Sequence, residues 1–305
     1  RLVDYARLVG KQLGDVPTAL GALQSVTATQ PSHTDAVSLL EELLPLAEAD
    51  AARGVAEQLL QGYRAGEQWE RAVELLGRLA SDAADPAQEA SLLQESAKIK
   101  SESLADAQGA YADLERAFRL VPTDEPLRFQ LEQAATHAGA WEALVTAYEA
   151  ALSIIDESTL QQAIRRKLAE LLERLGRAEE AVEHYKAAGG GELPEDLESL
   201  EALERLLREQ GRQEELYSVL ESIAARLPSD AADRRKKLLL EMGSIAEEQL
   251  LDKPRAIEVY RKLIEAAPGE LEPLRRLERL LAELGEPADL APVLDKLIEV
   301  GNTNP

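Results

Sequence analysis

Hydrophobic residues between positions 162 and 188 recur at helical spacing in two short runs, and a glycine separates the runs. The apolar positions are Leu168, Ala169 and Leu172 in the first run, and Ala181, Tyr185 and Ala188 in the second. Residues three and four apart share one face of a helix. Gly176 lies between the runs, and glycine tolerates the left-handed conformation that ends a helix. The pattern predicts two helices joined by a tight turn and packed through their apolar faces.

The pattern of the second helix recurs along the chain, each time with a proline twelve residues beyond its first apolar position. These segments are Ala19–Pro31, Ala110–Pro122, Leu216–Pro228 and Ala256–Pro268. Proline lacks the backbone N–H that a continuing helix needs. Each of these segments is therefore predicted to be a helix that ends before the proline and turns into the next helix.

Other landmarks repeat at a step of about 73 residues. Ser-Asp-Ala-Ala-Asp occurs at Ser81–Asp85 and again at Ser229–Asp233, which is about twice that step. Trp69 and Trp141 are one step apart, and so are Gly139 and Gly211. A fixed period of this kind indicates stacked copies of one supersecondary unit. The step is long enough for two helix pairs, so residues 1–305 are predicted to form a single all-α repeat array.

The helix pairs resemble the tetratricopeptide repeat, most clearly over Arg165–Ala188 with Gly-Arg-Ala-Glu-Glu-Ala at Gly176–Ala181. The doubled step resembles long bacterial members of that family, in which alternate units differ. One unit has a tight glycine turn, as at Gly139–Trp141, and the other has a turn with one extra residue, as at Leu251–Pro254. The resemblance implies a right-handed α-solenoid, a superhelix of stacked antiparallel helix pairs whose first helices line a concave groove.

Two segments depart from the pattern. Residues 32–54 have helical apolar spacing but do not complete a unit, so they are predicted to be a degenerate repeat or an extra helix. Residues 189–194 contain three consecutive glycines followed by Glu-Leu-Pro. A phosphate-binding loop needs a lysine and a hydroxyl residue after the glycines. The segment is therefore interpreted as a flexible connector between two sub-arrays.

The chain of 305 residues is strongly acidic, with a formal net charge of −23 and a pI near 4.6. Such a field repels phosphate backbones, so nucleic acid is not an expected partner. No apolar run reaches the roughly 20 residues of a membrane span, which argues against insertion into a bilayer. The absence of cysteine excludes disulfides and thiolate chemistry but leaves the compartment open. We expect a cytoplasmic location, with the periplasm as the open alternative.

The residue types that carry catalysis or bind metals lie far apart in this sequence. His33, His137 and His184 belong to different repeats, and a solenoid brings only neighbouring repeats into contact. The paired glutamates, such as Glu179-Glu180 and Glu247-Glu248, fit a solvated helix face better than a calcium loop. We therefore expect no catalytic residue, no bound metal and no cofactor. The recurring tyrosines and tryptophans are interpreted as core residues.

Arginines on the predicted first helices are the candidate binding residues. By register they point toward the groove, and they are Arg166, Arg205, Arg208, Arg275 and Arg279. A guanidinium group forks onto carboxylates, so these residues could bind an acidic segment of a partner. The alternative is pairing inside the array, with Glu170, Glu201, Glu209 or Glu283 on the same helices.

The sequence thus predicts a non-catalytic scaffold or adaptor that binds a partner protein or peptide in its groove, within a larger multiprotein assembly. Two alternatives stay open. The chain could be the regulatory or interaction region of a larger protein whose catalytic domain lies elsewhere, or it could be a structural spacer.

Overall fold

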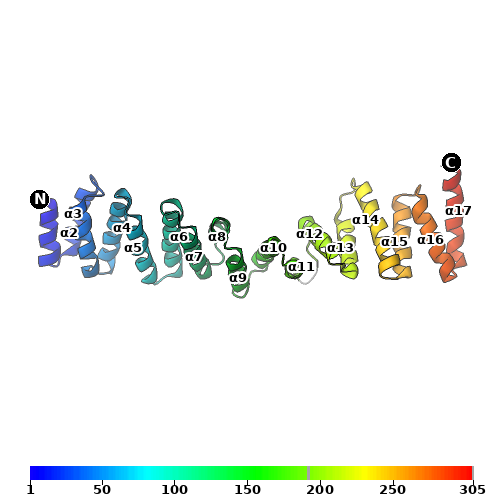
Figure 1. Cartoon of the computed structure of the whole chain (residues 1–305), viewed down its shortest axis with the longest axis horizontal. Coiled ribbons are helices and arrows are strands. Elements are labelled where there is room, and N and C mark those ends of the chain that lie inside the picture. Colours follow the sequence, from blue (N-terminus) through cyan, green and yellow to red (C-terminus); the bar gives the residue numbers. More distant parts are fainter. Residues whose placement is uncertain (191–192, 304–305) are drawn as a thin grey trace. The chain divides into compact units, whose positions relative to one another are not determined.

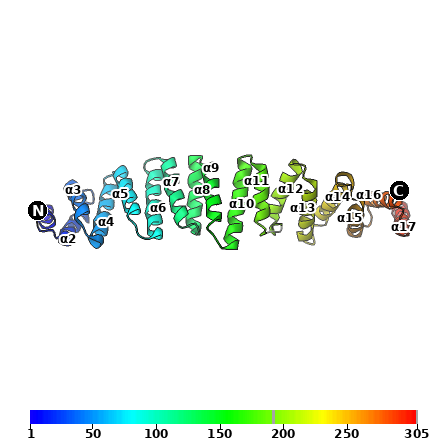
Figure 2. The ribbon, with the colours of Figure 1, turned by 90° about the horizontal axis from the view of Figure 1, so that it is seen from below.

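A computed structural model describes residues 1–190 and 193–303, and in these residues all the regular elements are helical. They form 17 α-helices in two compact units, Arg1–Ile155 and Asp156–Pro305. Within each unit, successive helices lie side by side as hairpins that stack on their neighbours (Figures 1 and 2). The prediction of an all-α fold of stacked helix pairs is confirmed.

Unit 1 contains four helix pairs and one additional helix. The pairs are α1 (Leu2–Arg7, extended by the π-turn η1, Leu8–Gln12) with α2 (Val16–Thr27), α4 (Ala49–Ala65) with α5 (Trp69–Ser81), α6 (Pro86–Glu102) with α7 (Ala107–Leu120), and α8 (Glu125–Ala138) with α9 (Trp141–Leu152). The additional helix is α3 (Thr34–Leu43), which packs against α1, α2 and α4 and continues into the short 3-10 turn η2 (Leu44–Leu46).

Unit 2 contains four pairs in unbroken succession. They are α10 (Ser158–Arg174) with α11 (Ala178–Ala187), α12 (Leu197–Glu209) with α13 (Gln213–Arg226), α14 (Ala232–Ser244, extended by the π-turn η3, Ile245–Gln249) with α15 (Lys253–Ala266), and α16 (Leu271–Leu284) with α17 (Pro287–Thr303). Within each unit, the first helix of every pair after the first also packs on the second helix of the pair before it, for example α14 on α13.

The turns inside the pairs are of two kinds. The tight turn contains a residue with positive φ, such as Gly176 at +75°. The backbone N–H of the next residue donates to the carbonyl oxygen five residues earlier, as from Arg177 N to Leu172 O at 2.8 Å. In the loose turn the bond reaches six residues back, as from Asp252 N to Ala246 O at 2.8 Å. Loose turns join α1 to α2, α6 to α7 and α14 to α15. The predicted extra residue therefore lengthens the hydrogen-bonded loop at the end of the first helix. In two of the three pairs the helix ends in a π-turn.

Aspartate side chains begin many of the helices. Asp15, Asp106 and Asp252, at the ends of the three loose turns, each accept a hydrogen bond from the backbone N–H three residues ahead. Such caps satisfy amide groups that have no partner inside the helix, and a negative charge also suits the positive end of the helix dipole. Part of the acidity of the chain therefore stabilises helix ends.

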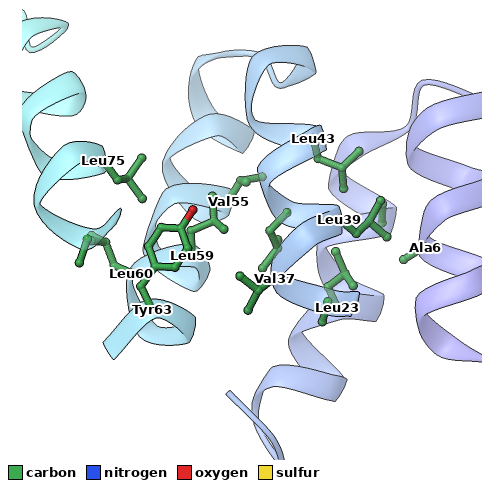
Figure 3. Close-up of a cluster of buried hydrophobic side chains, with 14 of the residues drawn as sticks. Ala6, Leu23, Val37, Leu39, Leu43, Val55, Leu59, Leu60, Tyr63 and Leu75 are labelled. Carbon is green, nitrogen blue, oxygen red and sulfur yellow. The ribbon is translucent and has the colours of Figure 1, made fainter. Parts of the chain in front are cut away.

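A cluster of buried hydrophobic side chains, most of them aliphatic, extends from α1 to α6 in unit 1 (Figure 3). Leu23 of α2, Leu39 and Leu43 of α3, and Leu59 of α4 are buried and belong to this cluster. The odd helix α3 thus contributes to the same core as the pairs on either side of it. Residues 32–54, the segment predicted to be a degenerate repeat or an extra helix, contain α3, η2 and the start of α4.

In unit 2 the helices α14 and α15 approach each other closely at Gly243. Gly243 of α14 lies under the ring of Tyr260, and a Cβ atom on Gly243 would come within 2.4 Å of the ring. The ring is fully buried. The glycine and the tyrosine therefore fit together in the way expected of small and aromatic residues on facing helices.

Positions 191 and 192 of the predicted connector at residues 189–194 lie outside the described residues, so the flexible connector stays a prediction. Among the described residues, no helix combines the length and the apolar character needed to cross a bilayer.

Candidate binding surface on the first helices

Charged side chains connect each first helix of unit 2 to the next, one repeat along. Arg205 of α12 pairs with Glu173 of α10, Arg208 of α12 with Glu241 of α14, and Arg279 of α16 with Glu247 of η3. The arginine side chains are about half exposed. We call this row of pairs the first-helix ladder. It places charged groups of both signs along one exposed face of the unit.

Tyrosines of the second helices reach the ladder from inside the core. The Tyr185 hydroxyl of α11 donates to Glu173 at 2.8 Å, and Glu173 also accepts from Arg205. Only 16% of the Glu173 side chain is exposed. The hydrogen bond with Glu173 raises the pKa of Arg205. One carboxylate therefore ties together two successive helix pairs.

The same arrangement recurs two pairs further along. Glu247 accepts a hydrogen bond from the Tyr260 hydroxyl at 2.9 Å and forms ion pairs with Arg276 and Arg279 of the next first helix. Its side chain is 11% exposed. In unit 1 a related cluster joins Glu41, the Tyr63 hydroxyl at 2.7 Å and Arg71 at 2.9 Å. A cluster of a tyrosine, a glutamate and an arginine thus occurs in both units of the chain.

The five candidate arginines all lie on first helices of unit 2, and four of them form ion pairs within the unit. Arg166 of α10 lies 3.6 Å from the Asp196 carboxylate at the start of α12, and Arg205, Arg208 and Arg279 belong to the first-helix ladder. Arg275 of α16 is exposed and forms no ion pair with the residues that the structure describes. Their role in binding a partner stays a prediction.

Four of the candidate arginines pair inside the array, but three of the four glutamates named as their alternative partners pair with other residues. Lys167 pairs with Glu170, Arg234 with Glu201 and Lys253 with Glu283. Within the described part of the chain, Arg208 is the one candidate arginine with a same-helix ion-pair partner, Glu204 at 2.9 Å, and this is a different glutamate from those expected. Glu173 and Glu247 of the ladder are more buried than Glu170, Glu201 and Glu283, and an ion pair is stronger where water is partly excluded.

The sequence pattern predicts the tyrosines in the core and the paired glutamates on the solvated face, and nothing in that pattern links a tyrosine to a particular glutamate. Tyr63, Tyr148, Tyr185, Tyr217 and Tyr260 are indeed buried. Four of these five donate their hydroxyl to a glutamate, including Tyr148 to Glu132. One signal was present in the sequence: both Glu173 and Glu247 are followed 32 residues later by an arginine.

The buried tyrosines make the fold sensitive to alkali. Burial raises the pKa of Tyr217 and of Tyr260 from 10.0 to about 12, and it also raises the pKa of Tyr63, Tyr111, Tyr148 and Tyr185. Between pH 10 and 12 the unfolded chain therefore binds fewer protons than the folded chain, so stability falls as the pH rises. Below pH 10 this contribution is fully present.

We expect helicity to be lost in the same pH interval in which the buried tyrosines ionise. The measurement is circular dichroism at 222 nm together with tyrosinate absorbance at 295 nm, followed upward from neutral pH. If the tyrosines titrate fully near pH 10 while the helical signal stays constant, their burial does not stabilise the fold in the way described.

The histidines do not form a common site. His33 caps α3 by accepting a hydrogen bond from Ala36 N at 3.4 Å, His137 lies in the last turn of α8, and His184 is half-buried in α11. Within the described ranges, no group of three or more histidine, aspartate or glutamate residues is placed to hold a metal ion.

Comparison with known proteins adds likenesses of fold only. No protein-family model matches the chain, and no curated protein matches it. A structure of Naa15/Naa10 bound to HypK-THB aligns over 98% of this chain and 63% of that chain, with 13% identity and a TM-score of 0.39. The chain thus spans less than two thirds of that protein.

Two smaller solved structures align as well. The MamA protein is 16% identical, with a TM-score of 0.30 over 65% of this chain and 93% of that chain. The C-terminal part of a TPR repeat-containing protein from Cytophaga hutchinsonii is 15% identical, with a TM-score of 0.36 over 82% of this chain and 95% of that chain. At such TM-scores the fold is better described from this chain's own helix pairs, which resemble tetratricopeptide repeats.

Proposed function

We propose that this chain is a non-catalytic interaction scaffold that binds an acidic segment of a partner protein on the first-helix ladder of unit 2. The observation that carries the proposal is the recurrence of arginines on alternate first helices of unit 2, with Arg205 and Arg208 on α12 and Arg275 and Arg279 on α16. An extended peptide laid along these helices meets a guanidinium group on each of them.

The internal ion pairs leave these arginines able to bind a ligand. Arg205 uses Nη2 toward Glu173, and Arg279 uses Nη2 toward Glu247. A guanidinium group carries five N–H donors, so most of them remain available, and both side chains are about half exposed. The glutamates also hold the side chains in place, which lowers the entropy lost when a carboxylate binds.

Arg275 gives the sharpest test, because reversing its charge breaks no internal pair. Substitution of Arg205 or Arg208 by glutamate would instead place a new carboxylate beside Glu173 or Glu241 and would disturb the array itself. The probe is a peptide selected from a random phage-displayed library on the intact chain. We expect acidic peptides to be enriched, and Arg275→Glu to weaken their binding about tenfold, a loss of about 1.4 kcal/mol.

The matched control is Lys296→Glu, which makes the same change of charge on the second helix α17, at an exposed position. Both variants are titrated against the labelled peptide by fluorescence anisotropy. Equal loss in the two variants would show that only the overall charge matters. Failure to enrich any peptide would reject the proposal and favour a structural spacer.

A further inference from the structure

A pocket of about 230 Å³ lies in unit 1, where residues of α3, η2, α4 and α5 meet. Pro45 has no backbone N–H for another helical hydrogen bond, so α3 ends before it and the chain continues as the short turn η2. Leu44 of this turn lines the pocket together with Leu59 of α4 and Leu75 of α5. Figure 3 shows Leu59 and Leu75 in the same buried cluster. The extra helix of unit 1 therefore helps to form this pocket.

The inner lining of the pocket is apolar and largely shielded from water. Leu59 is 1% exposed and Leu75 is 6% exposed, and Leu44 is half-buried. A water molecule occupies about 30 Å³ of the liquid, so the volume equals that of about seven waters. Pockets for drug-sized ligands measure roughly 300–1,000 Å³. This pocket therefore suits one small molecule with a short carbon chain.

Charged groups and a hydroxyl form the rest of the lining. The Glu41 carboxylate of α3 accepts hydrogen bonds from the Tyr63 hydroxyl of α4 at 2.7 Å and from Arg71 of α5 at 2.9 Å. Arg78 pairs with Glu74, one turn earlier on α5. The charges of the two arginines and the two glutamates cancel. The hydrogen-bonding groups that remain for a ligand therefore decide which chemistry the pocket favours.

The two arginines keep donors for a ligand. Arg71 donates to Glu41 through Nη1, and Arg78 donates to Glu74 through Nη2, whereas each guanidinium group carries five N–H donors. Their side chains are 58% and 69% exposed. Glu41 already accepts two hydrogen bonds, and a guanidinium group binds a carboxylate through two parallel bonds. The lining therefore favours an anion with an apolar body over a cation.

We propose that this pocket binds a small aliphatic carboxylic acid, with its carbon chain against the three leucines and its carboxylate on Arg78 and Arg71. The net charge of −23 repels anions at long range, so binding depends on these two arginines. A free acid of about six carbons matches the volume of the pocket. The pocket belongs to unit 1, so the proposal does not depend on peptide binding by unit 2.

The test uses the full chain with labelled leucine methyl groups, observed by NMR while hexanoate is added. We expect the methyl signals of Leu44, Leu59 and Leu75 to shift and to saturate, with a dissociation constant of about 1 mM. Hexanamide has the same chain without the charge and should bind about tenfold more weakly. Acetate lacks the chain and should leave these signals unchanged.

Two variants test the arginine contribution against a matched control. Arg78→Gln should weaken hexanoate binding about tenfold, and it breaks only an exposed ion pair with Glu74. Arg53→Gln breaks an exposed pair of the same spacing, with Glu57 on α4, at a position outside the pocket lining. It should bind hexanoate like the unmodified chain. Circular dichroism checks that both variants are folded.

Several results would overturn the proposal. The first is the absence of a saturable shift up to about 10 mM hexanoate, since that concentration nearly fills a site with a dissociation constant of about 1 mM. Equal binding of hexanamide, or tighter binding of hexylamine, would show that the carboxylate is not recognised. Equal weakening in Arg78→Gln and Arg53→Gln would show that only the overall charge matters. Tighter binding of an N-acetylated tripeptide that ends in leucine would assign the pocket to a protein chain end instead of a free acid.

Discussion

Replacing Tyr148 with alanine should lower the free energy of unfolding of unit 1 by about 3–5 kcal/mol, the usual range for removing a large buried aromatic side chain. Tyr148 of α9 is completely buried and contacts residues of α7 and α8. Its ring meets Phe118 edge to face, with 5.8 Å between ring centroids, and its hydroxyl donates to Glu132. The substitution leaves a cavity and also leaves this carboxylate without its donor.

Two further variants separate these causes. Tyr148→Phe keeps the ring and should cost only about 1 kcal/mol, the net value of one hydrogen bond. Tyr5→Ala removes a half-exposed tyrosine and should leave stability nearly unchanged. Hydrogen exchange followed by mass spectrometry localises the effect, because amides of α8 and α9 should lose protection first. Equal destabilisation by Tyr148→Phe and Tyr148→Ala would mean that packing of the ring contributes little.

Replacing Glu247 with alanine should destabilise unit 2 by about 2–4 kcal/mol. The carboxylate is mostly buried and accepts from Tyr260, Arg276 and Arg279, so its removal leaves three donors without their shared acceptor. Removing one member of a buried charged cluster costs more than the net value of the cluster, because the remaining groups stay desolvated.

The matched control is the adjacent residue. Glu248→Ala removes a carboxylate that is 54% exposed and pairs with Arg276 at 2.9 Å, and surface pairs of this kind contribute at most about 1 kcal/mol. Urea denaturation at low and high salt compares the two variants. The loss from Glu247→Ala should persist at high salt, because salt screens buried pairs only weakly. A loss that disappears with salt would place Glu247 among ordinary surface pairs.

The helix pairs were predictable because they depend on local signals. Apolar spacing, the turn residue Gly176 and the prolines after the second helices each act within a few residues of their own position. The extra residue of the loose turn was also visible, at Leu251–Pro254. Such signals predict elements and their order along the chain.

The site was less predictable, because it depends on contacts between repeats. Arg205 has glutamates four residues away on either side, yet it binds Glu173, which lies 32 residues back. The pairing depends on the burial of the Glu173 carboxylate and on its hydrogen bond with Tyr185. Neither of these can be inferred from the sequence of the helix that carries Arg205. The division after Ile155 likewise falls within a Ser-Ile-Ile-Asp-Glu stretch that contains neither glycine nor proline.

The first-helix ladder also limits how the gene can change by losing or gaining repeats. In the register set by the buried positions Leu203 and Met242, the place of Arg205 on α12 is taken by Ser244 on α14. Deleting the α12–α13 hairpin would bring Glu173 opposite this serine, and the half-buried carboxylate would lose its cation. Adjacent hairpins are therefore not interchangeable, although they share one fold. Recombination that removes or shuffles single hairpins should be selected against unless compensating substitutions follow.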